Sequence, residues 1–370
     1  MAEIPIQIPY VNLGAQWKDD SEELLPIIDK IFGSGQYVGG EEIEHLEDQI
    51  SKFCQVNYSV ALNSGTDALI LALHLLGVSQ GDEVITPPNS FIASTAVIVH
   101  LGAVPVFVDV LPDQNMDPDK IETAITEKTK AIMPVHLSGR ICDMDPIMEI
   151  ANNYELKIVE DAAQAIGSKY KSKPSGSIGD VGCFSTHPLK NLNSCGDGGF
   201  LVTNDKKIHL KAKLLRNHGL AERDRVHNFG YVSRMDSLQA GILNYRLKKL
   251  DEIIEKRRNN AKFYFKHIDA EEISLPLEKG YEFNTYHTFV IQVEKRNELK
   301  EFLLQQGIET AIHYPTPIHL QPAANKLGYK LGDFPLAEQQ AEMILTLPVN
   351  QSLNRMDLER ISIAVNEFYH

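Results

Sequence analysis

The stretch that decides the fold runs from residue 58 to residue 87 and reads YSVALNSGTDALILALHLLGVSQGDEVITP. Two short apolar runs, YSVALNS and DEVITP, have the length and composition of β-strands. Between them, TDALILALHLLGV places Leu69, Ala72, Leu73 and Leu76 on one side of a helix. A strand, a helix and a second strand in this order are typical of a parallel sheet that is covered by helices. The stretch therefore predicts an α/β fold.

The alternation of strands and helices continues to about Thr203. Further strands are expected at PVFVDV, KAIMPVH, KIVED, VGCFST and GFLVTN, with helices at residues 92–101 and 118–124. Strands that helices cover on both faces read as continuous apolar runs, as these do. We therefore predict a large α/β domain over residues 1–246, in which seven strands, counted with the first two, form a mostly parallel sheet.

The pattern changes in the last third of the chain. One long helix is expected from about Ser237 to His267. After it, HTFVIQV reads as a strand, RNELKEFLLQQG as a helix that ends at Gly307, and MDLERISIAVNEFY as a closing helix. We predict a second, smaller α+β domain over residues 247–370.

Composition and charge exclude several classes of function. The chain has 370 residues and a net charge of −14. Nucleic-acid binding needs concentrated Lys and Arg, and an anionic membrane surface would repel so acidic a chain, so neither is an expected partner. The first residues lack the basic and apolar regions of a signal peptide. Four scattered cysteines without a C-x-x-C pair suit a reduced compartment, so we expect a cytoplasmic protein.

The first chemical signal is Asn63-Ser64-Gly65-Thr66-Asp67, between a strand and a helix. Gly65 allows a tight turn, and the helix that begins here points unpaired N–H groups and the positive end of its dipole at the loop. Such a loop suits a phosphate. The simpler alternative is that Ser64 or Thr66 only caps the helix. The stretch lacks the lysine of a P-loop and the glycine spacing of a dinucleotide site, which favours a monophosphate.

The second signal is an acid at the end of a buried strand. In LKIVEDAAQAIG, Glu160 and Asp161 end the strand and Gln164 follows. Open α/β sheets bind ligands at the carboxyl ends of their strands. Asp161 could instead be a simple helix cap. A buried carboxylate needs a cationic partner, and a protonated pyridine nitrogen would supply one.

The third signal is CFSTHPLKNLNSCGDGGF, residues 183–200, which crowds reactive side chains into one loop. A Cys/His nucleophile, a metal site and an imine-forming lysine are all conceivable. Cys183 lies on an apolar strand and reads as a small buried hydrophobe, and Cys195 has no histidine at a persuasive spacing. A zinc site from His136, Cys183 and His187 matches no known ligand spacing. We therefore expect no metal, and the stretch by itself does not decide which of its side chains carries chemistry.

These motifs, taken together and in order, resemble a known family. N-S-G-T-D, ITPPNSFIAS, VEDAAQAIG, GDVGCFSTHPLKNLNSCGDGG, LRNHG and GYVSRMDSLQAGIL follow one another as in the DegT/StrS-like sugar aminotransferases. These are fold-type I enzymes that depend on pyridoxal 5′-phosphate (PLP). The resemblance runs from about Tyr10 to the C-terminus. It implies a homodimer with two sites at the interface.

The resemblance assigns roles around the cofactor. Lys190 matches the lysine that forms the internal aldimine with PLP, and Asp161 matches the partner of the pyridine nitrogen. Gln164 would lie near the phenolic oxygen, and Phe91 would stack on the ring. The phosphate contacts correspond to Ser64, Gly65, Thr66 and Ser185. His187, three residues before the lysine, reads as part of the site wall and is kept as a third candidate catalytic residue beside Lys190 and Asp161.

The resemblance also implies the reaction. An amino donor, expected to be L-glutamate, leaves its amine as pyridoxamine phosphate, and a keto sugar linked to a nucleotide accepts it. A lysine amine suits proton transfer between substrate and cofactor. Arg234 is a candidate for binding the donor carboxylate, or an ordinary interface arginine. Tyr314 and His319 match positions that approach the sugar. The pathway implied is deoxyamino-sugar supply for polysaccharide or lipopolysaccharide.

The sequence departs from the family pattern at two places. Val232 stands where an asparagine usually reaches the phosphate in the neighbouring subunit, and we hypothesise that Asn228 takes over. Thr186 stands where an aromatic residue is frequent, which would leave a roomier site.

Two other classes of function stay open. One is a PLP-dependent sugar dehydratase or lyase on the same scaffold, although the histidine-type dehydratases replace the lysine that is present here as Lys190. The other is a PLP-binding regulatory protein without turnover.

Overall fold

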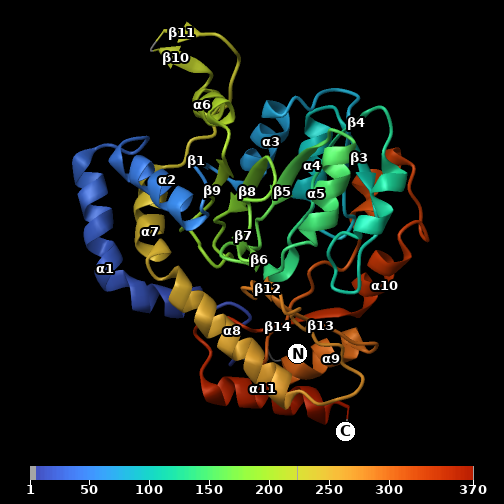
Figure 1. Cartoon of the computed structure of the whole chain (residues 1–370). Coiled ribbons are helices and arrows are strands. Elements are labelled where there is room, and N and C mark those ends of the chain that lie inside the picture. The colour runs from blue at the N-terminus through green and yellow to red at the C-terminus, as the bar shows by residue number, and fades with distance from the viewer. Residues whose placement is uncertain (1–5, 223, 370) are drawn as a thin grey trace.

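A computed structural model describes residues 6–222 and 224–369. Its centre is a seven-stranded sheet with the strand order β1-β9-β8-β5-β4-β2-β3 (Figure 1). Strands β8, β5, β4, β2 and β3 are parallel, whereas β9 runs antiparallel to both of its neighbours, β1 and β8. The prediction of a mostly parallel, seven-stranded α/β sheet is confirmed. The strands are β1 (Tyr58–Leu62), β2 (Glu83–Thr86), β3 (Val104–Phe107), β4 (Thr129–Ile132), β5 (Lys157–Asp161), β8 (Val181–Ser185) and β9 (Gly199–Thr203).

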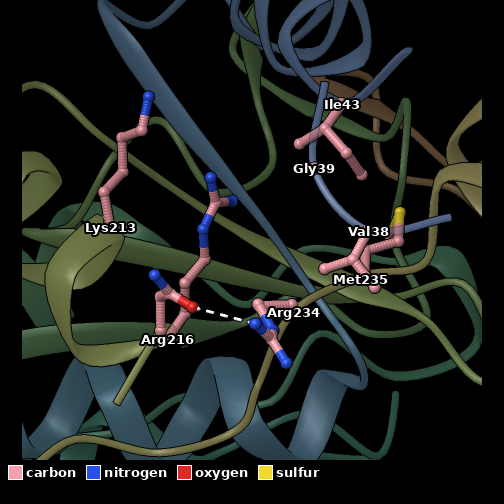
Figure 2. Close-up of a pocket in the computed structure, with 8 residues that line it drawn as sticks. Val38, Gly39, Ile43, Lys213, Arg216, Arg234 and Met235 are labelled. Carbon is pink, nitrogen blue, oxygen red and sulfur yellow. Dashed lines mark hydrogen bonds between the residues drawn. The ribbon is translucent and has the colours of Figure 1, made fainter. Parts of the chain in front are cut away.

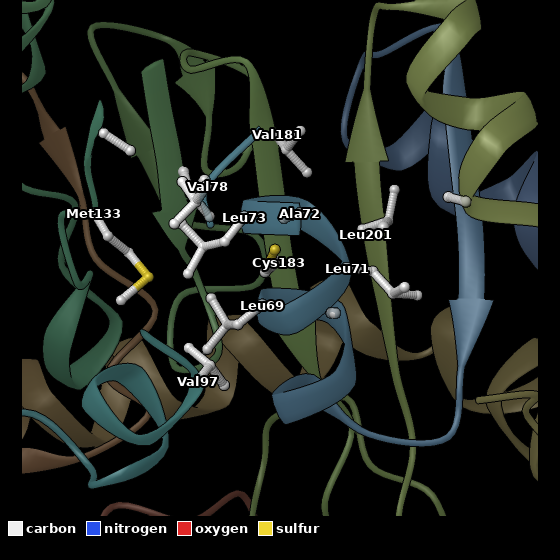
Figure 3. Close-up of a cluster of buried hydrophobic side chains, with 14 of the residues drawn as sticks. Leu69, Leu71, Ala72, Leu73, Val78, Val97, Met133, Val181, Cys183 and Leu201 are labelled. Atoms are coloured by element: carbon white, nitrogen blue, oxygen red, sulfur yellow. The ribbon is translucent and has the colours of Figure 1, made fainter. Parts of the chain in front are cut away.

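Helices cover both faces of this sheet. On one face lie α3 (Gly65–Leu75), α4 (Ala93–His100) and α6 (Lys206–Leu215), and on the other α2 (Glu41–Phe53), α5 (Met144–Asn153) and α7 (Ser237–Leu247). Figure 3 shows how Leu69 and Leu73 of α3 pack against the sheet, with Cys183 of β8 among them. Because strand residues alternate between faces, Ile158 packs against α5 while Val159 packs under α3.

A separate hydrophobic cluster holds the C-terminal third of the chain together. It joins the end of α8 (Leu250–His267) to β13 (Phe289–Gln292), α9 (Arg296–Gln305), β14 (Ile344–Leu347) and α11 (Arg355–Glu367). Ile8 from the other end of the chain belongs to the same cluster, and its N–H bonds to the carbonyl of Gly307. The N-terminal segment therefore packs on the C-terminal part before α1 (Leu13–Ser34) packs against α7 (Figure 1).

Short elements complete the fold. A small sheet of β6 (Lys169–Tyr170), β7 (Lys173–Pro174) and β12 (Glu282–Phe283) lies beside the large one, and α10 (Pro335–Met343) precedes β14. The hairpin of β10 (Leu220–Glu222) and β11 (Arg225–Val226) projects away from the body after α6 (Figure 1). Within the described residues, no helix combines the length and the apolar character that a membrane crossing requires.

Two predicted helices differ from the structure. The single helix expected over residues 237–267 is broken at Lys248 and Lys249 into α7 and α8. The break is invisible to periodicity because Leu247 and Leu250, on either side of it, are both buried in the same cluster. The segment 118–124 forms two 3₁₀ turns instead of an α-helix. Ile121 and the partly buried Ala124 anchor it in the core, and so short a segment has little helical stability of its own.

Candidate active site

The carboxyl ends of β1, β5 and β8 meet at one edge of the sheet and open onto a cavity of about 400 Å³. The loops that follow these strands carry the three sequence signals. Because the strands end at the same edge of the sheet, the residues of all three signals lie close together. Among the residues that line the cavity are ten of those predicted from the sequence: Ser64, Gly65, Thr66, Phe91, Asp161, Gln164, Ser185, His187, Lys190 and Tyr314.

A phosphate-sized cradle lies where α3 begins. Ser64 caps the helix, because its Oγ accepts a hydrogen bond from the Asp67 N–H at 3.1 Å, while the N–H groups of the first turn point toward the cavity end. A Cβ on Gly65 would lie 2.7 Å from the Cβ of Ser185, so this approach of two loops requires glycine. The cap and the anion site are thus compatible: the Asp67 N–H is used by the Ser64 cap, and the other N–H groups of the first turn are available to an anion.

Asp161 forms the buried base of the cavity. Its Oδ2 accepts a hydrogen bond from the Ser94 hydroxyl at 2.7 Å, and its Oδ1 accepts one from the Ala163 N–H at 3.2 Å. Burial raises the pKa of this carboxyl, while the two hydrogen bonds and the charge of Lys190 act in the opposite direction. A cationic group placed against Asp161 would favour the ionised form further.

Lys190 extends into the same cavity from a tight turn after β8. The Lys190 N–H donates to the carbonyl of His187 at 2.8 Å. Burial lowers the pKa of the Lys190 amine from its usual 10.5 to about 8, and the nearby Asp161 charge opposes that shift. A substantial share of this amine is therefore neutral, and hence nucleophilic, near neutral pH.

Two rings and an amide form another wall. Phe91, 54% exposed, and Tyr314 have ring centroids 5.7 Å apart. The Gln164 side-chain amide donates to the Tyr314 hydroxyl at 3.4 Å and accepts from the Ser138 N–H at 2.9 Å. Burial, followed by the Asp161 charge, raises the pKa of the Tyr314 hydroxyl to about 12. This wall offers the faces of two mutually tilted rings, with polar groups at its rim.

Five further lining residues with polar side chains escaped the sequence analysis: Tyr10, Ser94, Asp197, His287 and His313. Ser94 and Asp197 stand inside the quoted motifs ITPPNSFIAS and GDVGCFSTHPLKNLNSCGDGG, and His313 directly precedes the predicted Tyr314, so their positions were available as a signal. Tyr10 and His287 come from distant segments without a local signature. Burial and the nearby Lys190 charge lower the pKa of His313 to about 4 and that of His287 well below its usual range, which keeps both rings neutral.

Three predicted site residues lie outside this cavity. His319 is buried, and its Nε2 is 2.9 Å from Glu338 Oε1 while its ring packs against Phe334. Asn228 is on the exposed segment after the projecting hairpin. Arg234 lines a different pocket. Among the described residues, no group of three or more His, Cys, Asp and Glu side chains is arranged to hold a metal ion.

The pocket of Arg234, of about 300 Å³, is rich in positive charge. Figure 2 shows Lys213, Arg216 and Arg234 around it, with Val38 and Met235 on the opposite side. Arg216 pairs with Glu47, whereas Arg234 donates to the Asn217 side chain at 3.0 Å. None of the residues that line this pocket also lines the cavity of Lys190.

A seven-stranded, mostly parallel sheet with a lysine and a buried acid at its carboxyl edge defines the fold-type I aminotransferase class. The model of the DegT/DnrJ/EryC1/StrS aminotransferase family matches residues 18–366, and the chain belongs to this family. The dTDP-3-amino-3,4,6-trideoxy-alpha-D-glucose transaminase of Streptomyces venezuelae is 38% identical over 99% of this chain and 97% of its own length.

Solved structures extend the likeness to the fold. The crystal structure of S. venezuelae DesV in complex with a ketimine intermediate has a TM-score of 0.96 and 38% identity, and 99% of each chain is covered. The structure of NtdA from Bacillus subtilis with bound cofactor PMP has a TM-score of 0.88 and 33% identity, covering 94% of this chain and 82% of that one.

Proposed function

We propose that this chain is a PLP-dependent aminotransferase that moves an amino group from L-glutamate to a nucleotide-linked keto sugar. The observation that carries the proposal is the placement of a buried lysine, whose pKa burial lowers, and a buried carboxylate in one cavity with a helix N-terminus. Those three features suit the aldehyde, the ring nitrogen and the phosphate of PLP in turn. The family membership supports the same cofactor.

The residues of the cavity divide the work between binding and proton transfer. The first turn of α3 and Ser185 would hold the phosphate, and Phe91 would cover the ring. Asp161 would keep the ring nitrogen protonated through charge pairing. When bound, PLP supplies an electron sink for the carbanion formed on the amino donor. The amine of Lys190, once free, would carry the proton between the reacting carbon of the substrate and C4′ of the cofactor.

The amino donor and the assembly are proposed together. Asn228 and Arg234 stand apart from the cavity of Lys190 within one chain, and they flank exposed apolar side chains: Phe229 is 98% exposed and Val232 is 58% exposed. Exposed apolar side chains on a projecting segment favour burial against a second copy. In a homodimer, Arg234 of one copy would then bind the donor carboxylate in the site of the other copy. Asn228 of the first copy would lie near the cofactor phosphate in that same site.

The acceptor of the amino group would be a keto sugar that enters the cavity while its nucleotide stays outside the cofactor pocket. The rim offers hydrogen-bonding groups for sugar hydroxyls, Tyr314 and His313 among them. The product would be a deoxyamino sugar for surface polysaccharide or lipopolysaccharide. Retention of Lys190 separates this proposal from the sugar dehydratases that lack the lysine.

The proposal is tested in two half-reactions. Purified protein loaded with PLP is mixed with L-glutamate, and the absorbance of the PLP form should fall as 2-oxoglutarate appears. Keto sugars linked to dTDP or UDP are then added singly, and the true acceptor should restore the absorbance. A protein that binds PLP but converts no amino donor to its 2-oxo acid would support the regulatory alternative. Release of ammonia without an amino sugar would support a lyase.

A further inference from the structure

A buried side chain, that of Asn193, fastens the loop that carries Lys190. Its Nδ2 donates to the carbonyl of Pro188 at 2.7 Å and to Gln16 Oε1 at 3.0 Å. Its Oδ1 accepts from Gln16 Nε2 at 2.9 Å and from Arg246 Nη1 at 3.1 Å. An asparagine amide has two N–H donors and two acceptor lone pairs, so every hydrogen-bonding position of Asn193 is used.

Asn193 is in turn held by a buried ion pair. Arg246 of α7 also donates from Nη1 to the Asn193 carbonyl at 2.8 Å, and its Nε donates to Asp20 Oδ2 of α1 at 3.0 Å. The side chains of Arg246 and Asp20 are each only 6% exposed, and Lys249 lies 3.4 Å from the second oxygen of Asp20. A buried pair of this kind is costly to break, because a charge that stays behind in the interior loses its closest partner.

The two ends of the Asn193 bond to Pro188 lie on either side of Lys190. The bond therefore closes the segment 188–193 into a loop with the lysine inside it, and Arg246, Asp20 and Gln16 fix that loop to two helices. The backbone adds bonds from Lys190 N to His187 O and from Ser194 N to Thr186 O, both within the same turn. Without this anchor, the long and flexible lysine side chain would start from a mobile backbone.

We infer that Asn193 is a positioning residue for Lys190, and that the buried Asp20–Arg246 pair holds Asn193 in place. The expected effect of Asn193 on catalysis rests on the proposed function. The mobility of the loop can be measured by hydrogen exchange whether or not that function is correct. A displacement of about 1 Å in a reacting group can cost about 100-fold in rate, so a loosened loop would lower kcat more than it raises KM.

The test uses Asn193→Asp in full-length, cofactor-free protein. The side chain keeps its shape, but an oxygen replaces the amide donor and faces the acceptor carbonyl of Pro188. Hydrogen exchange of the amides of residues 189–194 should become about tenfold faster, as expected for the loss of one to two buried hydrogen bonds, while exchange in β13 stays unchanged. In the loaded protein, kcat should fall about 10- to 100-fold with KM for the donor within about twofold.

Gln239→Ala is the matched control. Gln239 holds the same loop further along, with bonds to the Cys195 N–H at 2.8 Å and the Cys195 carbonyl at 3.1 Å, but it does not reach Pro188. Its removal should leave exchange at 189–191 and kcat unchanged. Equal effects from both variants, or normal exchange in Asn193→Asp, would overturn the inference.

A milder variant covers the case in which Asn193→Asp does not fold. Gln16→Ala removes two of the four bonds of Asn193 and leaves those to Pro188 and Arg246. Exchange at 189–194 should then rise by a smaller factor, and an unchanged segment would again overturn the inference. Loss of amino transfer in every variant and in the wild type would refute the proposed function alone, because exchange is measured without turnover.

Discussion

The depressed pKa of Lys190 leads to the most specific prediction. Burial lowers the pKa of this amine from 10.5 to about 8. Near pH 7.5, roughly a quarter of the amine would then be neutral, compared with about a thousandth for a lysine at its usual pKa. The neutral amine is the nucleophile, so Lys190 should react about 200-fold faster than an exposed lysine of equal intrinsic reactivity.

The assay is competitive acetylation of the cofactor-free protein with a trace of acetic anhydride over a range of pH. Mass spectrometry of the peptide that contains Lys190 gives its extent of reaction, with exposed lysines of the same sample as the reference. The reactivity of Lys190 should rise with pH and reach its midpoint near 8. The accessibility of the cavity affects the rate but not the midpoint, so the midpoint is the quantity to compare.

The variant Asp161→Asn predicts the direction in which the midpoint of Lys190 reactivity should move. The Asp161 charge favours the ammonium form of Lys190, so its removal should move the midpoint further below that of the wild type. A wild-type midpoint near that of exposed lysines would refute the burial argument. A midpoint that rises in Asp161→Asn would refute the assigned electrostatic coupling between the two residues.

Further variants test other parts of the site. Gly65→Ala should weaken PLP binding about tenfold in a fluorescence titration, because the new Cβ would meet Ser185 Cβ at 2.7 Å; unchanged affinity would contradict the cradle. His319→Gln should lower the free energy of unfolding by about 1–3 kcal/mol in urea and leave KM for the sugar unchanged, because the imidazole that pairs with Glu338 is buried outside the cavity; a raised KM would return His319 to the site. Asn228→Ala should weaken PLP binding in the dimer, and wild-type affinity would remove Asn228 from the phosphate site.

Much of the fold could be predicted because its signals are local. Buried parallel strands read as apolar runs, and the strand that ends at Asp161 was placed from its own residues. The breaks between elements were harder to predict. Nothing near Lys248 resembles a helix end, since neither glycine nor proline stands there, and the bend follows from which cluster each helix joins.

The site was predictable where chemistry follows directly after a strand. Ser64, Asp161 and Ser185 lie at the ends of strands that meet at one edge, so sequence position alone implied their convergence. His287 and Tyr10 reach the cavity through tertiary packing, and no short pattern marks them. Arg234, which we propose to act in the site of a second copy, points to a further limit, because such a role has no signature in the geometry of its own chain.

The most direct test of the central claim follows the nitrogen atom. Protein loaded with PLP is incubated with L-glutamate labelled with heavy nitrogen and with the keto sugar nucleotide that restores the absorbance. The amino sugar product should carry the heavy nitrogen, in an amount equal to the 2-oxoglutarate formed, and Lys190→Ala should form neither. An unlabelled product, or label transfer that survives in Lys190→Ala, would contradict the account.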